Sequence, residues 1–357
     1  SIYRPDVVIV GGGVAGLTTA LNLAPRKVCI ITKSTLGVNT SSMWAQGGIA
    51  AAVGINDSVK SHIEDTVATA KGLADENVIV KVVNEAKNII NDLSKKLDFD
   101  LLDLLTKGPE DKINLTEFSQ PTILISSVLL AKYSNEVSNV DITAGLSLGE
   151  YSALVYADCL ELSDAIKLVN HRGKLMQDAV PEGTAGMLVV LNMPINDVYQ
   201  MIAAVNETDE TINFSTDNAD GVSVLAGKNT AIEACKKYIE ENEFKRVKTQ
   251  MVQMSVPSHC YLLDKAQEEL SKLLNEVEFK TPSVPVIPNV LAEPTSSVDV
   301  IKDSLINQLT HTVRWRESLD YLVRNKLSIL MDAGPGKTII NMARKIKDVE
   351  KISLESN

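Results

Sequence analysis

The stretch of sequence that decides the fold is Val140-Asp-Ile-Thr-Ala-Gly-Leu-Ser-Leu-Gly-Glu-Tyr-Ser-Ala-Leu-Val155. Its first five residues predict a strand, and the residues from Glu150 onward predict a helix. Between them, Gly145-Leu-Ser147-Leu-Gly149 has the spacing of a nucleophile elbow, the sharp turn that exposes a reactive serine. The N-terminal end of the following helix favours negative charge at Ser147. The alternative is a tight turn without a catalytic role.

A serine nucleophile needs a base, which is most often a histidine. The chain has four histidines, at positions 62, 171, 259 and 311. His171 falls on the polar arc of a predicted helix over 163–180, and His311 lies in a polar stretch. His259 follows a predicted strand and precedes a helix, in the kind of loop where catalytic groups gather. Elimination favours His259, although a loop histidine can also be a surface residue without a role.

Arg172 lies in the middle of the apolar arc of the predicted helix 163–180. A guanidinium that faces a protein core must be paired, because an unpaired buried charge costs roughly 3–5 kcal/mol. Either an internal salt bridge pairs Arg172, or its planar guanidinium is a fork for a substrate carboxylate.

These residues resemble the malonyl-CoA:acyl-carrier-protein transacylase family over about residues 97–349. The motifs that carry the resemblance are Gln120-Pro121, Gly145–Leu154, His171–Gln177, Val180–Thr184, Val256–Cys260, Gln308-Leu309 and Gly334–Lys337. The resemblance implies that Ser147 is the nucleophile, that His259 is its base and that Arg172 binds the malonyl carboxylate. It also implies that the backbone carbonyl of Gln308 orients the histidine, and that Gln120 and Leu148 belong to the substrate site.

The resemblance implies malonyl transfer from malonyl-CoA to the phosphopantetheine thiol of acyl carrier protein, as in fatty acid biosynthesis, without a cofactor. Three departures stand out. Leu146 replaces the family's histidine, and Asn218-Ala-Asp-Gly-Val222 replaces Asn-Ser-Pro-Gly-Gln. The family's opening strand and Gly-Gln-Gly loop, which helps to form the oxyanion hole, have no counterpart. One oxyanion donor, the Leu148 amide, is therefore assigned, and we expect slow acylation.

The N-terminal region carries a second pattern. Asp6–Val10 predicts a strand, and Gly11, Gly13 and Gly16 follow in G-x-G-x-x-G spacing before a predicted helix, the context of a pyrophosphate cradle. A tight turn that binds nothing is the alternative. The second strand, over 27–32, ends in Thr32-Lys33 without the usual acidic residue.

Thr40–Ala50 and Asp57–Thr66 resemble the L-aspartate oxidase branch of the succinate dehydrogenase-type flavoproteins, over about residues 5–92. The resemblance implies that FAD could be bound by Gly11, Gly13, Gly16, Lys33, Ser41, Gly47 and Gly48. The family's capping domain and distal flavin-binding segment have no counterpart. An aspartate oxidase-like flavoprotein fragment and a non-catalytic chimera are therefore the alternative functions.

The fold class that these patterns predict is α/β. We expect a Rossmann-type βαβ fragment over residues 1–92 and an acyltransferase domain over 93–357 with a hydrolase-like parallel-sheet core. Within that domain, strand and helix patterns over about 186–252 follow the order βαββαβ, which predicts an inserted ferredoxin-like subdomain.

Composition narrows the functional classes further. The 357 residues carry a net charge of −11, which argues against a nucleic-acid binder that relies on a basic surface. No apolar run is long enough for a membrane span. The four cysteines lie in no metal-binding or disulfide pattern, so we expect a cytoplasmic enzyme. An acidic carrier protein would need local basic patches, for which the candidates are Arg314/Arg316 and Arg344/Lys345/Lys347.

Overall fold

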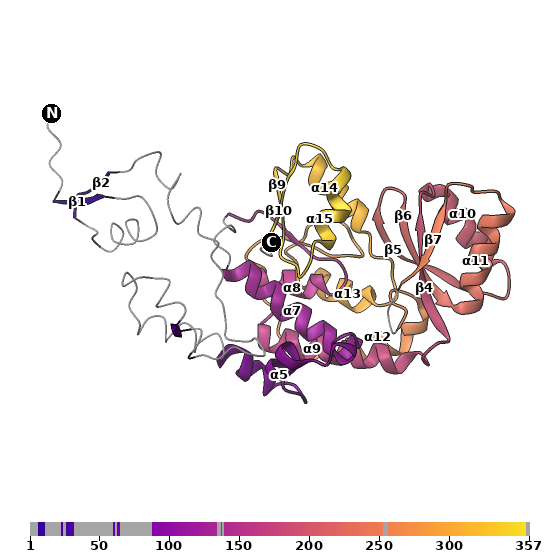
Figure 1. Cartoon of the computed structure of the whole chain (residues 1–357), viewed down its shortest axis with the longest axis horizontal. Helices are drawn as coiled ribbons and strands as arrows, with labels where there is room; N and C mark the ends of the chain where they lie inside the picture. Colours follow the sequence, from indigo (N-terminus) through magenta and orange to yellow (C-terminus); the bar gives the residue numbers. More distant parts are fainter. Residues whose placement is uncertain are drawn as a thin grey trace. The chain divides into compact units, whose positions relative to one another are not determined.

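The computed structural model describes residues 6–10, 23, 26–31, 60, 63–64, 88–133, 137, 139–252 and 256–354 (Figure 1). The chain divides into two compact units, Ser1–Gly48 and Ile49–Glu355. The boundary at residues 92–93 that the sequence indicates stays a prediction.

In the first unit, two apolar strands are described, β1 (Val7–Val10) and β2 (Val28–Ile31). They pair in parallel, with Val7 opposite Val28 and Val10 opposite Ile31. The N–H of Lys27 donates to the Asp6 carboxylate at 2.9 Å, which ties the two strand starts together.

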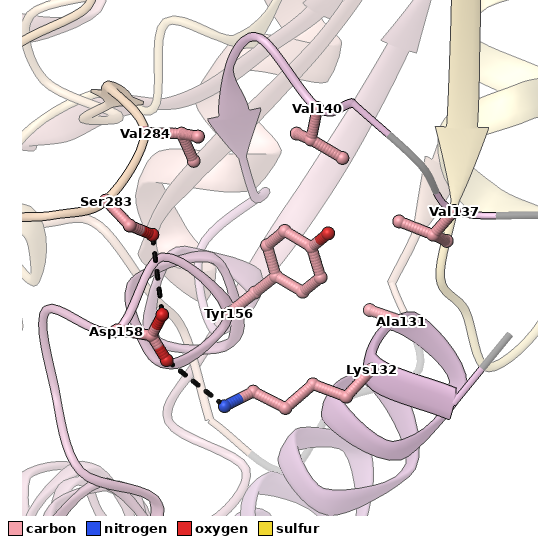
Figure 2. Close-up of a pocket in the computed structure, with 8 residues that line it drawn as sticks. All are labelled: Ala131, Lys132, Val137, Val140, Tyr156, Asp158, Ser283 and Val284. Carbon is pink, nitrogen blue, oxygen red and sulfur yellow. Dashed lines mark hydrogen bonds and ion pairs between the residues drawn. The ribbon is translucent and has the colours of Figure 1, made fainter. Parts of the chain in front are cut away.

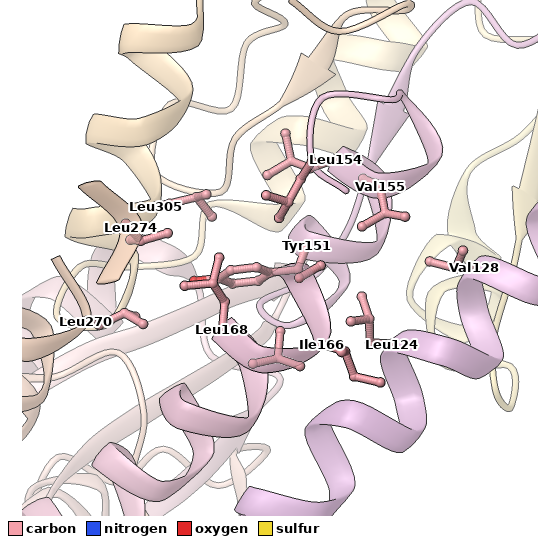
Figure 3. Packing of buried hydrophobic residues seen from close by; sticks show 14 of the residues in the cluster. Leu124, Val128, Tyr151, Leu154, Val155, Ile166, Leu168, Leu270, Leu274 and Leu305 are labelled. Atoms are coloured by element: carbon pink, nitrogen blue, oxygen red, sulfur yellow. The ribbon is translucent and has the colours of Figure 1, made fainter. Parts of the chain in front are cut away.

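The second unit has a layer of helices around one apolar core. Residues 88–94 are helical, and the helices that follow are α5 (Leu101–Lys107), α6 (Glu110–Ile113), α7 (Thr116–Tyr133), α8 (Gly149–Tyr156), α9 (Leu162–Ala179), α12 (Asp264–Glu276) and α13 (Val298–Gln308). Figure 3 shows Tyr151 of α8 surrounded by Leu168 of α9, Leu270 and Leu274 of α12 and Leu305 of α13. Each fully buried aliphatic side chain contributes about 1.5–3 kcal/mol, so this core holds α8 firmly.

Short parallel strands alternate with the helices along the chain, as the predicted α/β class implies. β3 (Thr143–Ala144) pairs in parallel with β8 (Val286–Ile287), and β9 (Ile329–Asp332) pairs in parallel with β10 (Glu350–Ser353). β3 is shorter than the strand predicted over 140–144. Pro285 and Pro288 flank β8, and because proline has no N–H to donate, the ladder ends there. Two further helices near the C-terminus are α14 (Trp315–Arg324) and α15 (Thr338–Met342).

The second unit also contains a four-stranded antiparallel sheet with two helices of its own. Its elements, in chain order, are β4 (Ala185–Leu191), α10 (Ile195–Asn206), β5 (Ile212–Ala219), β6 (Val222–Lys228), α11 (Asn229–Glu241) and β7 (Lys248–Met251). The strand order is β5-β6-β4-β7, and every neighbouring pair is antiparallel. The two helices lie beside each other (Figure 1), and their apolar side chains belong to a separate core.

The contact between α7 and α9 fixes the placement of the helix that carries Arg172. Pro121 lies inside α7 and has no N–H to donate to the carbonyl four residues earlier. That carbonyl, of Glu117, instead accepts a hydrogen bond from Asn170 Nδ2 of α9 at 2.9 Å. A Cβ at Gly173 would lie 2.6 Å from the Glu117 Cα, so the two backbones approach too closely for a side chain there.

None of the helices in the part of the chain that the structure describes is long and apolar enough to cross a membrane. Cys159, Cys235 and Cys260 are buried as free thiols, and Cys29 is partly exposed and also free.

Candidate active site

The predicted nucleophile elbow connects β3 to α8. Ser147 has φ of 51°, in the left-handed region that non-glycine residues seldom adopt. A Cβ at Gly145 would overlap the backbone of Gly149, whereas a Cβ at Gly149 meets no described atom within 4 Å. The turn therefore depends sterically on its first glycine rather than on both.

His259 lies beside this serine, as elimination among the histidines predicts. Its Nε2 is 2.8 Å from Ser147 Oγ, and its Nδ1 is 2.6 Å from the backbone oxygen of Gln308. A carbonyl oxygen only accepts, so Nδ1 carries the proton and Nε2 is free to accept the serine proton. Burial, together with the positive charge of Arg172, lowers the pKa of His259 to about 3, so the imidazole is neutral near pH 7 and its Nε2 carries a free lone pair.

The other two described histidines lie elsewhere. His171 is exposed, and its Nδ1 is 2.8 Å from the Lys167 carbonyl of its own helix. His311 is also exposed, with Nδ1 3.0 Å from the Asn307 carbonyl. Both contacts are local ones on the protein surface.

Arg172 is 2% exposed and points into the site. Its Nη1 donates to Gln120 Oε1 at 2.8 Å, and its Nη2 donates to Gln308 Oε1 at 3.1 Å and to Ser147 Oγ at 3.2 Å. Nε has no partner among the described residues. Of the two explanations that the sequence left open, the geometry favours the fork, because every partner of the guanidinium among the described residues is neutral.

Among the described arginines, Arg314 and Arg316 form ion pairs, whereas Arg172 forms none with a described residue. Arg314 pairs with Glu317 at 2.5 Å, and Arg316 pairs with Asp217 at 2.8 Å and with Asp320 at 3.0 Å. The first predicted docking patch is thus neutralised by neighbouring carboxylates. In the second patch Arg344, Lys345 and Lys347 are exposed, and the Lys345 ammonium donates to the Asp220 carbonyl at 3.3 Å.

Two buried residues that sequence reasoning missed complete the site. Asn289 follows β8; its Oδ1 accepts from the Ser147 N–H and its Nδ2 donates to the Gly145 carbonyl, both at 2.6 Å. Glu150, the third residue after the serine, accepts from the Asn289 N–H at 3.0 Å and from Gln308 Nε2 at 2.8 Å. An acidic residue at the start of an otherwise apolar helix was a signal that could have identified Glu150.

Gln308 connects the parts of this site. Its backbone oxygen accepts from His259, its side-chain oxygen accepts from Arg172, and its side-chain nitrogen also donates to the Ser147 carbonyl at 3.0 Å. We call the resulting group the active-site cluster; its members are Gln120, Ser147, Glu150, Arg172, His259, Asn289 and Gln308.

Leu148, predicted as an oxyanion donor, occupies the N-cap position of α8 in helical conformation. The first amides of a helix have no partner within the helix and are therefore available to an anion. The predicted cofactor-binding residues Gly11, Gly13, Gly16, Lys33, Ser41, Gly47 and Gly48 all lie outside the described residues.

A pocket of about 490 Å³ lies away from the active-site cluster, at the other end of α8 (Figure 2). Tyr156 faces it, and Lys132 closes one side through a 3.4 Å ion pair with Asp158. Asp158 also accepts from Ser283 Oγ at 3.5 Å. This pocket contains none of the residues that the sequence predicted for catalysis.

Two domain families match the sequence, an FAD binding domain over residues 6–126 and an acyl transferase domain over residues 70–345. The chain is 36% identical over 265 residues to the malonyl CoA-acyl carrier protein transacylase of Haemophilus influenzae, which covers 73% of this chain and 84% of that protein. It is 34% identical over 280 residues to the enzyme of the same name from Escherichia coli K12, which covers 77% of this chain and 88% of that protein.

Solved structures agree with these relatives. The crystal structure of FabD from Acinetobacter baumannii has a TM-score of 0.71 at 30% identity, over 76% of this chain and 86% of that one. A malonyl-transacylase in complex with its type II PKS acyl-carrier protein has a TM-score of 0.71 at 31% identity, over 76% of this chain and 88% of that one.

Proposed function

Since this chain belongs to the acyl transferase family, among the malonyl CoA-acyl carrier protein transacylases, we propose that it transfers malonyl from malonyl-CoA to acyl carrier protein through an ester on Ser147. The active-site cluster supplies a nucleophile, with a neutral base and a buried guanidinium each within hydrogen-bond reach of its hydroxyl. Acyl transfer by these groups requires no cofactor.

In the first half-reaction, Ser147 Oγ attacks the thioester carbon while His259 Nε2 accepts the hydroxyl proton. The negative charge that develops on the thioester oxygen is stabilised by the Leu148 amide. The C–S bond then breaks, and the proton on Nε2 passes to the departing CoA sulfur. The Gln308 carbonyl, 2.6 Å from Nδ1, holds the ring and stabilises its positive charge.

The second half-reaction reverses these roles. The phosphopantetheine thiol gives its proton to His259 Nε2, and its sulfur attacks the malonyl-serine ester. The C–O bond breaks, and Ser147 Oγ regains a proton from Nε2. The carrier leaves with the malonyl thioester, and the base is neutral again.

The single observation that carries this proposal is the pairing of Arg172. The guanidinium is 2% exposed, lies 3.2 Å from the nucleophile, and its hydrogen-bond partners in the described part of the chain are all neutral. A buried positive charge beside a nucleophile, on a guanidinium whose Nε has no partner among the residues that the structure describes, suits an acyl group that carries its own carboxylate. Malonyl is such a group, and acetyl is not.

The test is acylation of the purified chain by malonyl-CoA, followed by peptide mass mapping. We expect one malonyl group on Ser147, no label in Ser147→Ala and slow labelling in His259→Ala. His311→Ala is the matched control, because this exposed histidine lies outside the active-site cluster. Label on another residue, or unchanged label in Ser147→Ala, would exclude the proposed mechanism.

We propose that the acidic carrier protein docks on Arg344, Lys345 and Lys347. These side chains are exposed, whereas Arg314 and Arg316 are engaged in ion pairs. Reversing the charge of Arg344 and Lys347 should raise the KM for acyl carrier protein at low salt and leave acylation by malonyl-CoA unchanged. An unchanged KM would remove this surface from the proposal.

A second candidate function concerns the N-terminal region. The FAD binding domain match over residues 6–126 and the parallel pairing of β1 with β2 support binding of the nucleotide end of FAD. We expect weak FAD or ADP binding and no aspartate-dependent oxygen consumption. Flavin that stays bound through gel filtration, seen in the absorbance spectrum, would show that this region is a complete flavin site.

We also propose how the strands of the second unit are arranged. The order and pairing of β4 to β7 favour a ferredoxin-like subdomain, and the parallel pairs β3–β8 and β9–β10 favour a hydrolase-like core. We further propose that the first unit has a Rossmann-type βαβ arrangement and that the protein acts in the cytoplasm.

A further inference from the structure

Glu150 is a buried carboxyl group that the proposed reaction does not use. Its side chain is 1% exposed, and both hydrogen bonds that it accepts, from Gln308 Nε2 and the Asn289 N–H, reach the same oxygen, Oε2. The other oxygen, Oε1, has no partner among the described residues. Oε1 is therefore the atom on which a proton can reside without disturbing either hydrogen bond.

The amide of Gln308 connects this carboxyl group to Arg172. Arg172 Nη2 donates to Gln308 Oε1 at 3.1 Å, and Gln308 Nε2 donates to Glu150 Oε2 at 2.8 Å. The guanidinium and the carboxylate thus face each other through one side chain. This arrangement compensates the buried positive charge and leaves the guanidinium free to contact a ligand directly.

Few other titratable groups act on this carboxyl group. Tyr151, next to it on α8, has its pKa raised to about 12 by burial, and His259 has its pKa lowered to about 3. Both are neutral near pH 7. Gln120 of α7, Gln308 of α13 and Asn289 carry no charge, so Arg172 and ionised Glu150 are the charged members of the active-site cluster, and their charges cancel at a pH above the Glu150 pKa of about 7.

Binding of a malonyl carboxylate to Arg172 would change that balance. Two negative groups would then share one buried guanidinium, and a second buried charge of the same sign is costly without a partner. Resting on the proposed malonyl transfer, we propose that Glu150 is the proton-accepting counter-ion of the substrate site: ionised while Arg172 is unoccupied, it takes up a proton when a substrate carboxylate binds Arg172.

The electrostatics of the free site are compatible with this exchange. Burial raises the pKa of Glu150 to about 7, against the opposing effects of its two hydrogen bonds and of Arg172. An added anion raises this pKa further, so uptake approaches one proton at pH 8. Malonyl-CoA binding then weakens by up to about tenfold per pH unit above pH 7. Acetyl-CoA brings no carboxylate, and its binding is expected to change little with pH.

Calorimetry on the Ser147→Ala chain tests this inference, because that variant can bind the acyl-CoA without being acylated. Titrations with malonyl-CoA and acetyl-CoA at pH 8, in buffers of different ionisation enthalpy, give the number of protons taken up. We expect close to one more proton for malonyl-CoA than for acetyl-CoA, since the CoA phosphates contribute equally to both. The Glu150→Gln change in the same background keeps an acceptor for Asn289 and Gln308 and should abolish the excess.

Several outcomes would overturn the inference. Equal proton uptake for the two ligands, or an excess that survives Glu150→Gln, would assign the proton elsewhere. The comparison of the two ligands in Ser147→Ala stands even where Glu150→Gln does not fold. Failure of the proposed function is recognised separately, because malonyl-CoA would then leave no label on Ser147 of the unaltered chain.

Discussion

Arg172→Ala gives the sharpest test of how the site recognises its substrate. A bidentate contact between a guanidinium and a carboxylate has two charge-assisted hydrogen bonds, each worth about 1.5–3 kcal/mol. Their loss corresponds to about 3–6 kcal/mol, or roughly a 10²–10⁴-fold drop in kcat/KM for malonyl-CoA. Acetyl-CoA has no carboxylate, so its acylation rate should change by less than about tenfold.

The effect of Arg172→Ala on stability is expected to be small by comparison. The side-chain oxygens of Gln120 and Gln308 lose a donor, which costs about 1 kcal/mol each. Glu150 loses its counter-charge, but its pKa of about 7 allows it to take up a proton. We therefore expect a loss of at most about 2 kcal/mol, below the roughly 3–5 kcal/mol of a broken buried ion pair.

The assay combines acyl-enzyme formation from each donor with urea unfolding. Arg172→Lys should restore acylation by malonyl-CoA only in part, because an ammonium is a point charge without the planar fork. A stability loss above about 4 kcal/mol together with an unaltered malonyl-to-acetyl ratio would refute the fork and restore the salt-bridge explanation.

Three further outcomes are expected from acylation and unfolding measurements. Asn289→Ala should slow acylation roughly 10–100-fold at nearly unchanged KM and cost about 2–3 kcal/mol, because the strained turn loses the bonds of Asn289 to the Ser147 N–H and to the Gly145 carbonyl; an unchanged rate would contradict this. Gly145→Ala should abolish labelling whereas Gly149→Ala is tolerated, and equal behaviour of the two variants would count against the turn geometry. Because the pKa of His259 is lowered to about 3, the base stays neutral and acylation at saturating acyl-CoA should be flat from pH 7 to pH 5; a tenfold fall per unit below pH 6 would indicate an ordinary histidine.

The elements that could be predicted from sequence are those with a local pattern. The elbow around Ser147 was recognisable because glycine spacing, a preceding strand and a following helix lie within 16 residues. His259 could be found because few histidines compete with it. The α/β class and the parallel strands followed from alternating apolar patterns.

The remaining parts of the site depend on contacts between distant residues. Asn289 holds Ser147 from 142 positions away, and no local pattern distinguishes it from a surface asparagine. Arg316 is basic in sequence but is neutralised by Asp217, 99 positions earlier. For Arg172, periodicity indicates burial but not the partner, so two explanations remained open until the guanidinium contacts were known.

Pro121 has two opposite effects: it lowers the stability of α7 locally, and it enables a contact between α7 and α9. Because proline has no N–H, Pro121 weakens α7 locally, but it also leaves the Glu117 carbonyl available to accept a hydrogen bond from Asn170 of α9. Arg172 lies two residues after Asn170. The orientation of its guanidinium therefore depends on a contact made where α7 lacks a backbone hydrogen bond. Substrate recognition in this protein is thus tied to a local weakness, and evolution toward a more stable α7 at this position would act against the placement of Arg172.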